Sequence, residues 1–183
     1  MTLPLQYSLE KLDQLEGSPI VLPFFNSDIA WQIGTLAREL AQELPKPIMI
    51  DVTLANGQVL FHSPSKQGTM PDNDAWVNRK KKTVLRFGKS SFYMGRKLAK
   101  KEKDAGCSLG TEKAYFVSSL EYATHGGSVP IKAANFDGLY GALTISGLAQ
   151  EEDHMFALKV LVETKRRLES VEKQLDLDWK IGL

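Results

Sequence analysis

Cysteine is nearly absent from this sequence, and histidine is scarce. The 183 residues contain one cysteine, Cys107, and three histidines. A single cysteine excludes an internal disulfide and any metal site built from cysteines alone, and it favours a reducing compartment. The histidines, His62, His125 and His154, stand singly in the sequence and give no ligand spacing such as HExxH. The sequence therefore predicts no metal site.

Long apolar runs and targeting signals are also missing. No apolar stretch approaches the roughly 20 residues of a membrane helix, and the N-terminus lacks a basic region followed by an apolar one. We therefore expect a cytoplasmic protein without a membrane partner. A chain of 183 residues with 43% hydrophobic and 25% charged residues is typical of one globular domain, which we expect to span residues 1–183.

Charge of either sign is in little excess, because the formal net charge is only +1. Locally, however, eleven of the 23 Lys and Arg residues fall between Asn78 and Lys103, against the single acid Glu102. A basic run of this density can bind phosphates. Its more common meaning is a solvated face, or a face toward an acidic partner. The interleaved aromatic residues fall mostly at core spacing, so nucleic acid is the less favoured partner.

Apolar residues that recur at steps of three and four predict five amphipathic helices. They cover residues 5–15 (an N-terminal helix within residues 1–17), 29–44, 74–87, 91–104 and 150–175. The second helix ends before Pro45, and Gly106 is well placed to end the fourth. The last helix opens on three acidic residues, which the helix dipole favours at that end.

Two hairpins are predicted between these helices. Residues 48–54 and 58–62 flank Asn56-Gly57, a strong hairpin signal, and residues 128–134 and 139–148 flank a second polar connection. A further strand is expected over Ile20–Phe25 and a short one within Ser108–Thr124. Hairpins alternating with helices predict an α+β fold, in which helices cover the faces of an antiparallel sheet.

The segment from His125 to His154 is the expected centre of the molecule. Backbone N–H groups of Gly126-Gly127 can approach an anion, although a tight entry into a strand also requires glycine. His154 follows Asp153 near the start of the last helix, where a neutral imidazole is favoured. For each histidine, a structural or interface role competes with axial ligation of haem.

Lys80 lies on the apolar stripe of its helix, three residues after Val77 and four before Val84. A buried ammonium without a partner is costly, so we expect a carboxylate, a bound anion or a path to solvent. A salt bridge between subunits and a ligand-binding role both remain open. No base is recognisable beside Cys107 or Ser146, so no catalytic residue is assigned.

Several motifs in order give the chain a family resemblance. GGSVPI, YGALTISGL and a helix opening on EEDH resemble the HbpS-like/GlcG-like family, also called the haem-degrading domain family. The stretch WVNRKKKTVLRFGKSSFYMG resembles the middle motif of its bacterial and fungal branch. The resemblance runs from about Ile20 to the last helix. It implies a profilin-like, three-layer α/β/α arrangement around a central antiparallel sheet, and assembly of dimers into larger rings.

The resemblance also concerns particular residues. Family members carry a lysine followed three residues later by a threonine in the helix before the second hairpin, and Lys80 and Thr83 match these positions. The family's turn before V-P-I often holds three glycines, whereas this chain reads HGGS from His125 onward. This departure separates the chain from the family pattern at the turn that would line a pocket.

Together these observations predict a homo-oligomer without catalytic activity that binds a small anionic ligand or a partner protein. The candidate ligand-binding residues are Lys80, Thr83, His125, Gly126, Gly127, Asp153 and His154. A haem-binding or haem-degrading protein is the alternative, because some family members are linked to haem. A ring-forming structural adaptor without a ligand is the third hypothesis.

Overall fold

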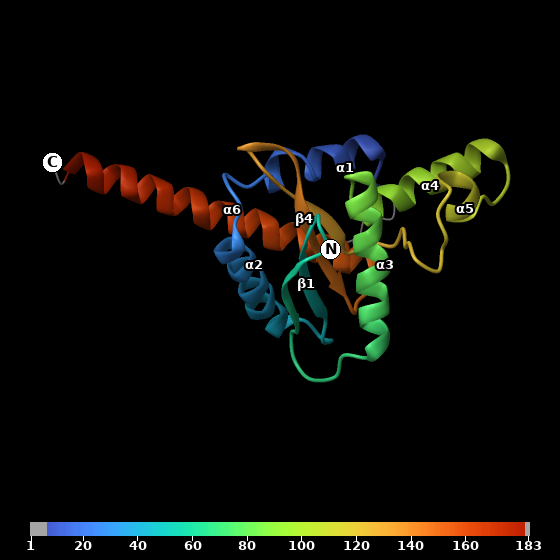
Figure 1. The fold of residues 1–183 in the computed structure, drawn as a ribbon, viewed down its shortest axis with the longest axis horizontal. Helices are drawn as coiled ribbons and strands as arrows, with labels where there is room; N and C mark the ends of the chain where they lie inside the picture. The colour runs from blue at the N-terminus through green and yellow to red at the C-terminus, as the bar shows by residue number, and fades with distance from the viewer. Residues whose placement is uncertain (1–6, 182–183) are drawn as a thin grey trace.

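A four-stranded antiparallel sheet in the order β2-β1-β4-β3 forms the centre of the computed structural model (Figure 1). Its strands are β1 (Met49–Leu54), β2 (Val59–Pro64), β3 (Ser128–Ala133) and β4 (Phe136–Ser146). The structure describes residues 7–181, without the side chains of residue 172 and residues 175–181. Leu5 and the side chain of Leu175, both counted in the predicted helical stripes, lie outside this description.

Helices cover both faces of the sheet, as predicted. On one face lie α2 (Ser27–Leu40) and the beginning of α6 (Gln150–Ile181), and on the other lies α3 (Pro71–Phe87). Helix α4 (Ser91–Ala105) and the short α5 (Gly110–Tyr115) form a lobe beside α3, and α1 (Leu9–Leu15) packs against α4 (Figure 1). Short 3₁₀ turns, Ser18–Ile20 and Ala41–Glu43, follow α1 and α2.

The apolar core lies between the sheet and the α2–α6 layer. Strand residues at alternating positions, such as Ile50, Val52 and Leu143, point into it and are fully buried. Ile33 of α2 and Leu161 of α6 meet them from the helical side. Burial of these side chains is the main stabilising contribution to the fold, since it scales with the apolar area removed from water.

Both predicted hairpins form, and the second one turns earlier than expected. The first turn lies at Asn56-Gly57, where Gly57 has a φ of 92°. In the second hairpin Ala133 pairs with Phe136, so the chain turns at Ala134-Asn135 and β4 begins three residues before the predicted Leu139. The pairing of Ala133 with Phe136 extends the ladder to the tip, where the rings of Phe136 and Tyr140, both on β4, meet edge to face at 5.0 Å.

Two predicted strands are wrong. The segment Ile20–Phe25 makes a single parallel bridge, between Leu22 and Ala133, after the 3₁₀ turn. Pro19 and Pro23 flank Leu22 and cannot donate backbone hydrogen bonds, which limits the ladder to one bridge. Within Ser108–Thr124 the chain forms helix α5 instead of a strand, because the Glu102 carboxylate accepts the N–H groups of Leu109 and Gly110.

Helix boundaries differ from the prediction by a few residues. Helix α3 begins at Pro71, before the predicted caps, because the Asn73 side chain accepts the Met70 N–H and Pro suits the first turn. Helix α6 continues past Leu175 to Ile181 and projects from the body as a rod (Figure 1). Val171, placed on its apolar stripe, is therefore exposed. Among the described residues, no helix is both long and apolar enough to cross a membrane.

Candidate functional site

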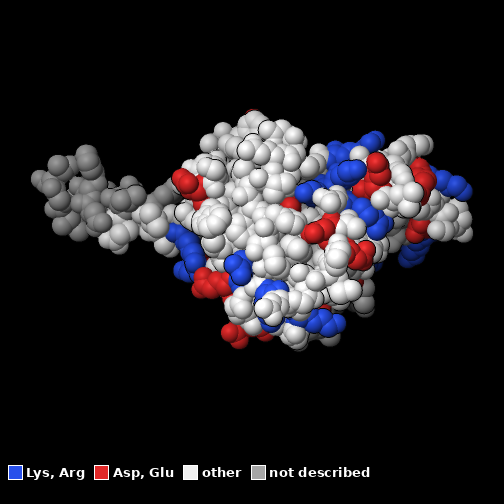
Figure 2. Space-filling model, turned by 60° about the horizontal axis from the view of Figure 1, so that its bottom comes forward, with Lys and Arg blue, Asp and Glu red and all other residues white. Residues whose placement is uncertain are grey.

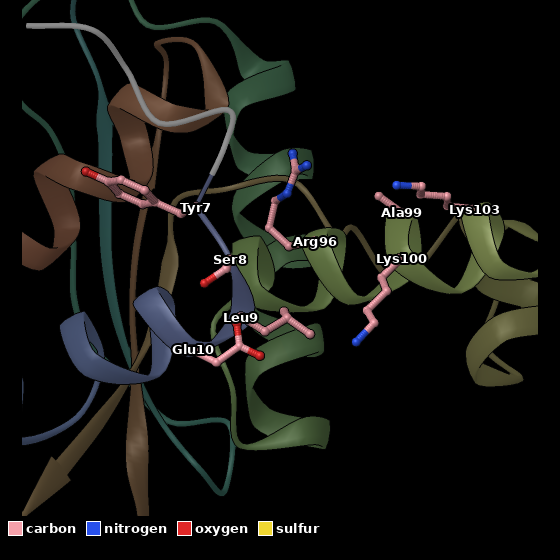
Figure 3. A pocket seen from close by; sticks show the side chains of 8 residues that line it. All are labelled: Tyr7, Ser8, Leu9, Glu10, Arg96, Ala99, Lys100 and Lys103. Carbon is pink, nitrogen blue, oxygen red and sulfur yellow. The ribbon is translucent and has the colours of Figure 1, made fainter.

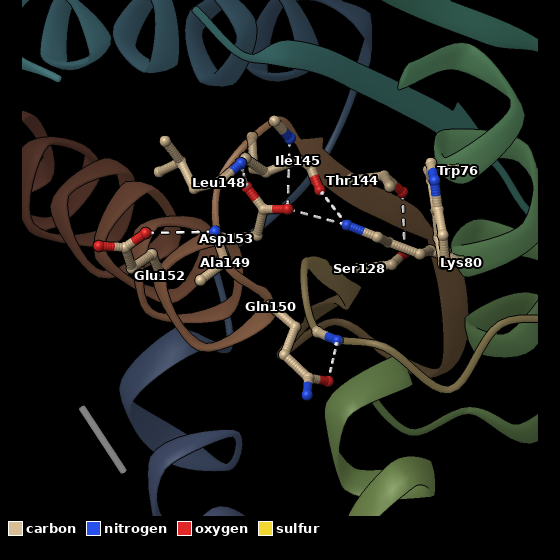
Figure 4. A network of polar contacts seen from close by, with 12 residues as sticks. Trp76, Lys80, Ser128, Thr144, Ile145, Leu148, Ala149, Gln150, Glu152 and Asp153 are labelled. Atoms are coloured by element: carbon tan, nitrogen blue, oxygen red, sulfur yellow. Dashed lines mark hydrogen bonds and ion pairs between the residues drawn. The ribbon is translucent and has the colours of Figure 1, made fainter. Parts of the chain in front are cut away.

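A polar layer separates α3 from the sheet. The strand residues that alternate with the apolar core positions face α3, and they include Asp51, Thr53, Ser128 and Thr144, all buried. Ser128 and Thr144 share a hydrogen bond of 2.8 Å between their hydroxyl groups (Figure 4). Buried polar groups are stable only when paired. The layer is thus a network of hydrogen bonds rather than a second apolar core.

Lys80 of α3 and Asp153 of α6 form the central ion pair of this layer. The Lys80 Nζ lies 2.9 Å from Asp153 Oδ2 and donates a second hydrogen bond to the Ile145 carbonyl, at 3.0 Å (Figure 4). Asp153 also accepts the backbone N–H groups of Gly147 and Leu148, at 3.4 and 3.1 Å. The pair therefore joins α3, the end of β4 and the start of α6.

Burial opposes the charge on both members of this pair. It lowers the pKa of Lys80 and raises the pKa of Asp153, while the attraction between the two charges acts in the opposite direction on each. Both side chains are almost inaccessible to solvent. The ion pair persists because each charge has the other, and hydrogen bonds satisfy the remaining atoms of the carboxylate.

A cavity of about 230 Å³ opens beside the ion pair. Trp76 and His125 form part of its wall, and their rings meet edge to face at 4.8 Å. The start of α6 contributes Gln150. The complete lining is Asp72, Asn73, Trp76, Lys80, His125, Ser146, Gly147, Leu148, Gln150 and Asp153. A second cavity, of about 240 Å³, shares His125 and Gln150 with the first and extends along α4.

Hydrogen-bond donors outnumber free acceptors at this cavity. The Lys80 ammonium has three donors, of which the described residues occupy two. The Gln150 side-chain oxygen accepts the Gly126 N–H, which leaves its amide NH₂ group free to face a ligand. Trp76 donates to Asp72 Oδ2, which engages one of the two oxygens of that exposed carboxylate at the rim. A ligand that supplies acceptor oxygens complements this set of groups.

His125 is a neutral imidazole at the junction of the two cavities. Partial burial lowers its pKa, and the positive charges of Lys80 and Arg79 lower it further. Within the described part of the chain its ring nitrogens make no hydrogen bond, and its only ring contact is with Trp76. The imidazole can therefore donate to or accept from a ligand without breaking an existing bond.

The remaining predicted residues are near this cavity but do not line it. The Thr83 hydroxyl donates to the Ala123 carbonyl at 2.9 Å and holds α3 against the loop between α5 and β3. At Gly126, a Cβ atom would lie 2.0 Å from the Gln150 carbonyl, and at Gly127 it would lie 2.3 Å from the Ile145 carbonyl. Both glycines are needed for close packing of the strand entrance, and Gly127 also has a φ of 121°.

His154 points away from Lys80, into the contact between α6, α4 and α1. Its ring stacks on Phe92 at 4.7 Å, and its Nε2 lies 3.4 Å from Glu16 Oε1 without good hydrogen-bond geometry. Burial lowers the pKa of His154 to about 3 and raises the pKa of Glu16 to about 7. His154 is therefore a neutral imidazole near neutral pH, and the Glu16 carboxyl becomes protonated as the pH falls below about 7.

A second buried cluster, centred on Asp51, escaped the sequence prediction. Asp51 accepts from Thr53 at 2.6 Å, lies 2.9 Å from His62 Nδ1 and 3.4 Å from Lys81 Nζ. The other ring nitrogen of His62 lies 3.1 Å from Asp74. The available signal was the alternation in MIDVTL, which places Asp51 and Thr53 on one face of the strand. Among the described residues, no group of three His, Cys, Asp or Glu could hold a metal ion.

Comparison with known proteins identifies the family. The family described as "Haem degrading protein HbpS-like" matches residues 25–161. The chain is an HbpS-like protein. It is 44% identical to the UPF0303 protein YBR137W of Saccharomyces cerevisiae over 93% of this chain and 90% of that one. It is also 38% identical to the UPF0303 protein SCO2848 of Streptomyces coelicolor, over 87% and 95% of the two chains.

Solved structures agree with this assignment. The crystal structure of Ybr137w matches the HbpS-like chain with a TM-score of 0.78 over 87% of this chain and 90% of that one. A structure described as a PduOC–haem complex matches with a TM-score of 0.60 at 18% identity, over 76% and 94% of the chains. At that identity the likeness concerns the fold alone.

Proposed function

We propose that this HbpS-like protein binds a small anionic ligand without catalysis, in the cavity beside the Lys80–Asp153 pair. The observation that carries the proposal is the excess of free donors around the cavity: the third Lys80 donor, the Gln150 amide and the His125 imidazole. A carboxylate is the acceptor group that fits three donors of this kind. The Trp76 ring offers apolar contact for the rest of the ligand.

Nothing in this cavity supports a reaction. The Lys80 ammonium is neutralised by Asp153, which leaves it a poor nucleophile or base. His125, although neutral, makes no hydrogen bond with the described residues that would orient it as a general base. Binding is therefore the chemistry that this arrangement supports best.

Self-association in the cytoplasm is part of the proposal. The outer part of α6 leaves the body of the molecule (Figure 1), with Val171 exposed near its start, and Val162 is exposed on the outward face of the part that packs on the core. A helix without tertiary contacts is marginal in water. Packing of this rod against a second copy would bury these side chains. The same contact would serve a ring-forming adaptor without a ligand, which is the competing hypothesis for the whole protein.

Native mass spectrometry of freshly purified protein tests ligand binding and assembly together. We expect an oligomer that carries a small molecule in one-to-one ratio with the subunits. The variant His125→Ala/Gln150→Leu should lose that molecule and keep the oligomer, whereas Asn78→Ala, on the exposed face of α3, should keep both. Retention of the molecule by the double variant would place the ligand elsewhere. If the oligomer carries no small molecule and does not bind benzoate, used as a carboxylate probe in calorimetry, the adaptor hypothesis is favoured.

Haem binding is the second candidate, because a structural neighbour is described as a haem complex and His125 has a free imidazole. The imidazole fits an axial ligand, but the cavity of about 230 Å³ is smaller than the pockets that enclose even drug-sized molecules. Haem could thus bind only across the surface, and the residues of this cavity assign no step of haem degradation. Titration with hemin decides: a stoichiometric Soret band lost in His125→Ala would favour haem.

A further inference from the structure

Most cations of the basic run between Asn78 and Lys103 are engaged within the fold, four of them by carboxylates. Seven of its cations contact a carboxylate, a backbone carbonyl or an aromatic ring, namely Arg79, Lys80, Lys81, Lys82, Arg86, Lys89 and Lys101. The other four, Arg96, Lys97, Lys100 and Lys103, all belong to α4 and make no hydrogen bond or ion pair with the residues that the structure describes. Within this run, the cations that make no such contact with the described residues thus all lie on one helix.

Three of these four cations line one groove. Arg96, Lys100 and Lys103 flank a cavity of about 390 Å³ between α4 and residues 7–10 at the start of α1 (Figure 3). Tyr7, Leu9 and Ala99 supply its apolar wall. Figure 2 shows Lys and Arg gathered at the end of the molecule that α4 and α5 form, with acidic residues among them.

Two of the acidic residues of this lobe, Glu102 and Glu112, are already engaged. Glu102 accepts the N–H groups of Leu109 and Gly110, and Glu112 accepts that of Ser119. Glu10, the one acid that lines the groove, is held by its own backbone N–H and the Ser8 hydroxyl. Residues 1–6, MTLPLQ, contain no acidic residue. Three cations against one acid leave the groove with a local charge of about +2.

The spacing of the cations excludes a single small anion as the natural ligand. On a helix that rises 1.5 Å per residue, Arg96 and Lys100 are about 6 Å apart along the axis, and Lys103 lies about 4.5 Å further. Their charged ends point in different directions (Figure 3). They therefore do not converge on one atom, and they suit a ligand whose negative charges are spread along a chain.

An extended acidic peptide has this spacing. Side chains on one face of an extended segment recur about every 6.6 Å, which is close to the 6 Å between helix positions four apart. Alternate carboxylates can thus reach successive cations of α4, while the apolar residues between them point the other way, toward Tyr7 and Leu9 on the opposite wall of the groove. Nucleic acid fits less well, because the groove offers three cations and one aromatic ring, Tyr7, for phosphates and bases.

We propose that the α4 groove docks an extended acidic segment of a partner protein, through Arg96, Lys100 and Lys103. The site is separate from the cavity at Lys80, so the proposal stands or falls independently of the small-ligand function. Its contacts are exposed ion pairs, and the affinity is accordingly moderate and falls as the salt concentration rises.

Fluorescence anisotropy of a labelled peptide with Asp and Leu in alternation tests the proposal on the full chain. We expect saturable binding at low salt, and binding about three- to tenfold weaker in Lys100→Gln/Lys103→Gln. The matched control is Lys82→Gln/Lys97→Gln, which removes two exposed charges outside the groove and should bind normally. A peptide with Asn in place of Asp should not bind.

Several results would overturn the proposal. Equal loss in both double variants would mean attraction to net charge rather than to the groove. Displacement of the peptide by single-stranded DNA at lower concentration than by unlabelled peptide would assign the surface to nucleic acid. Absence of peptide binding at low salt, with the variants folded and of unchanged oligomeric state, would mean that the groove is a solvated face.

Discussion

Lys80 and Asp153 lie 73 residues apart in the sequence and meet at 2.9 Å in the interior, where both side chains are shielded from water. One is on the helix that covers the polar face of the sheet, and the other is in the first turn of the helix that covers the apolar face. The pair therefore fastens the two helical layers to each other at the end of β4. This contact also forms the floor of the proposed ligand cavity.

Removing either member of this pair should destabilise the protein strongly. We expect Lys80→Met and Asp153→Asn each to lower the free energy of unfolding by about 3–5 kcal/mol, because each leaves a buried polar group without its partner. The double variant should lose much less than the sum of the two. Urea denaturation of the four proteins gives the coupling energy.

Lys81→Met is the matched control for this experiment. Lys81 pairs with Asp51, but that carboxylate keeps Thr53 and His62 as partners, so we expect a smaller loss than for Lys80→Met. Additive effects of Lys80→Met and Asp153→Asn would contradict the view that the two residues act as one structural unit.

The Glu16–His154 contact should respond to pH. Burial raises the pKa of Glu16 to about 7 from 4.5, so its contribution to stability is complete below pH 4.5 and is lost as the pH rises to about 7. Glu16→Gln keeps the Ser90 hydrogen bond without a charge. Relative to the parent protein, this variant should gain about 3 kcal/mol of stability between pH 4.5 and 8.

The comparison with the parent protein is necessary because His154 changes the stability with pH in the opposite direction to Glu16. Its pKa of about 3 lies below the ordinary 6.5, so its contribution is present above pH 6.5 and is lost as the pH falls toward 3. Glu10→Gln, an exposed substitution on the same helix, should show no such pH-dependent gain. Chemical denaturation at several pH values measures the difference, and a constant difference for Glu16→Gln would show that burial does not raise the pKa of Glu16.

Gly127 should tolerate no side chain, for two reasons that can be separated. An alanine there would be strained by a φ of 121° and would place its Cβ 2.8 Å from Lys80 Nζ and 2.3 Å from the Ile145 carbonyl. At Gly88 the φ is 65° and no atom lies within 4 Å of a Cβ. We expect Gly88→Ala to cost about 1 kcal/mol and Gly127→Ala several times more, in equilibrium unfolding. If both variants lose the same free energy of unfolding, backbone strain alone explains the effect at Gly127.

Local features were predictable because they depend on neighbours in the sequence. The Asn56-Gly57 turn, the acidic start of α6 and the amphipathic stripes gave the hairpins, the helices and the class of fold. The two wrong strand predictions also have physical causes. The segment around Leu22 has strand-like composition, but its ladder depends on Ala133, more than a hundred residues later, and on prolines that cannot donate. Helix α5 depends on Glu102, a residue of another helix.

The candidate site was only partly predictable. The apolar positions around Lys80 predicted that its ammonium group is buried and needs a partner, because this depends only on neighbouring residues of the same helix. The sequence could not predict which residues surround Lys80, because their distances depend on how α3 and α6 dock on the sheet. Three features were therefore missed: Asp153 as the partner of Lys80, Trp76 and Gln150 as cavity walls, and the orientation of His154 toward Glu16. The Asp51 cluster joins two strands and a helix, and its members look ordinary in sequence.

By itself, the sequence determined both hairpins and five of the helices, that Lys80 has to be neutralised, and that α4 lies within a strongly basic stretch. Only the tertiary structure decided which charges are neutralised and which stay free, as on Arg96, Lys100 and Lys103. The physical reason is the range of the forces. Periodicity and turn chemistry act between residues a few positions apart, whereas an ion pair or a cavity exists only between surfaces that folding brings into contact.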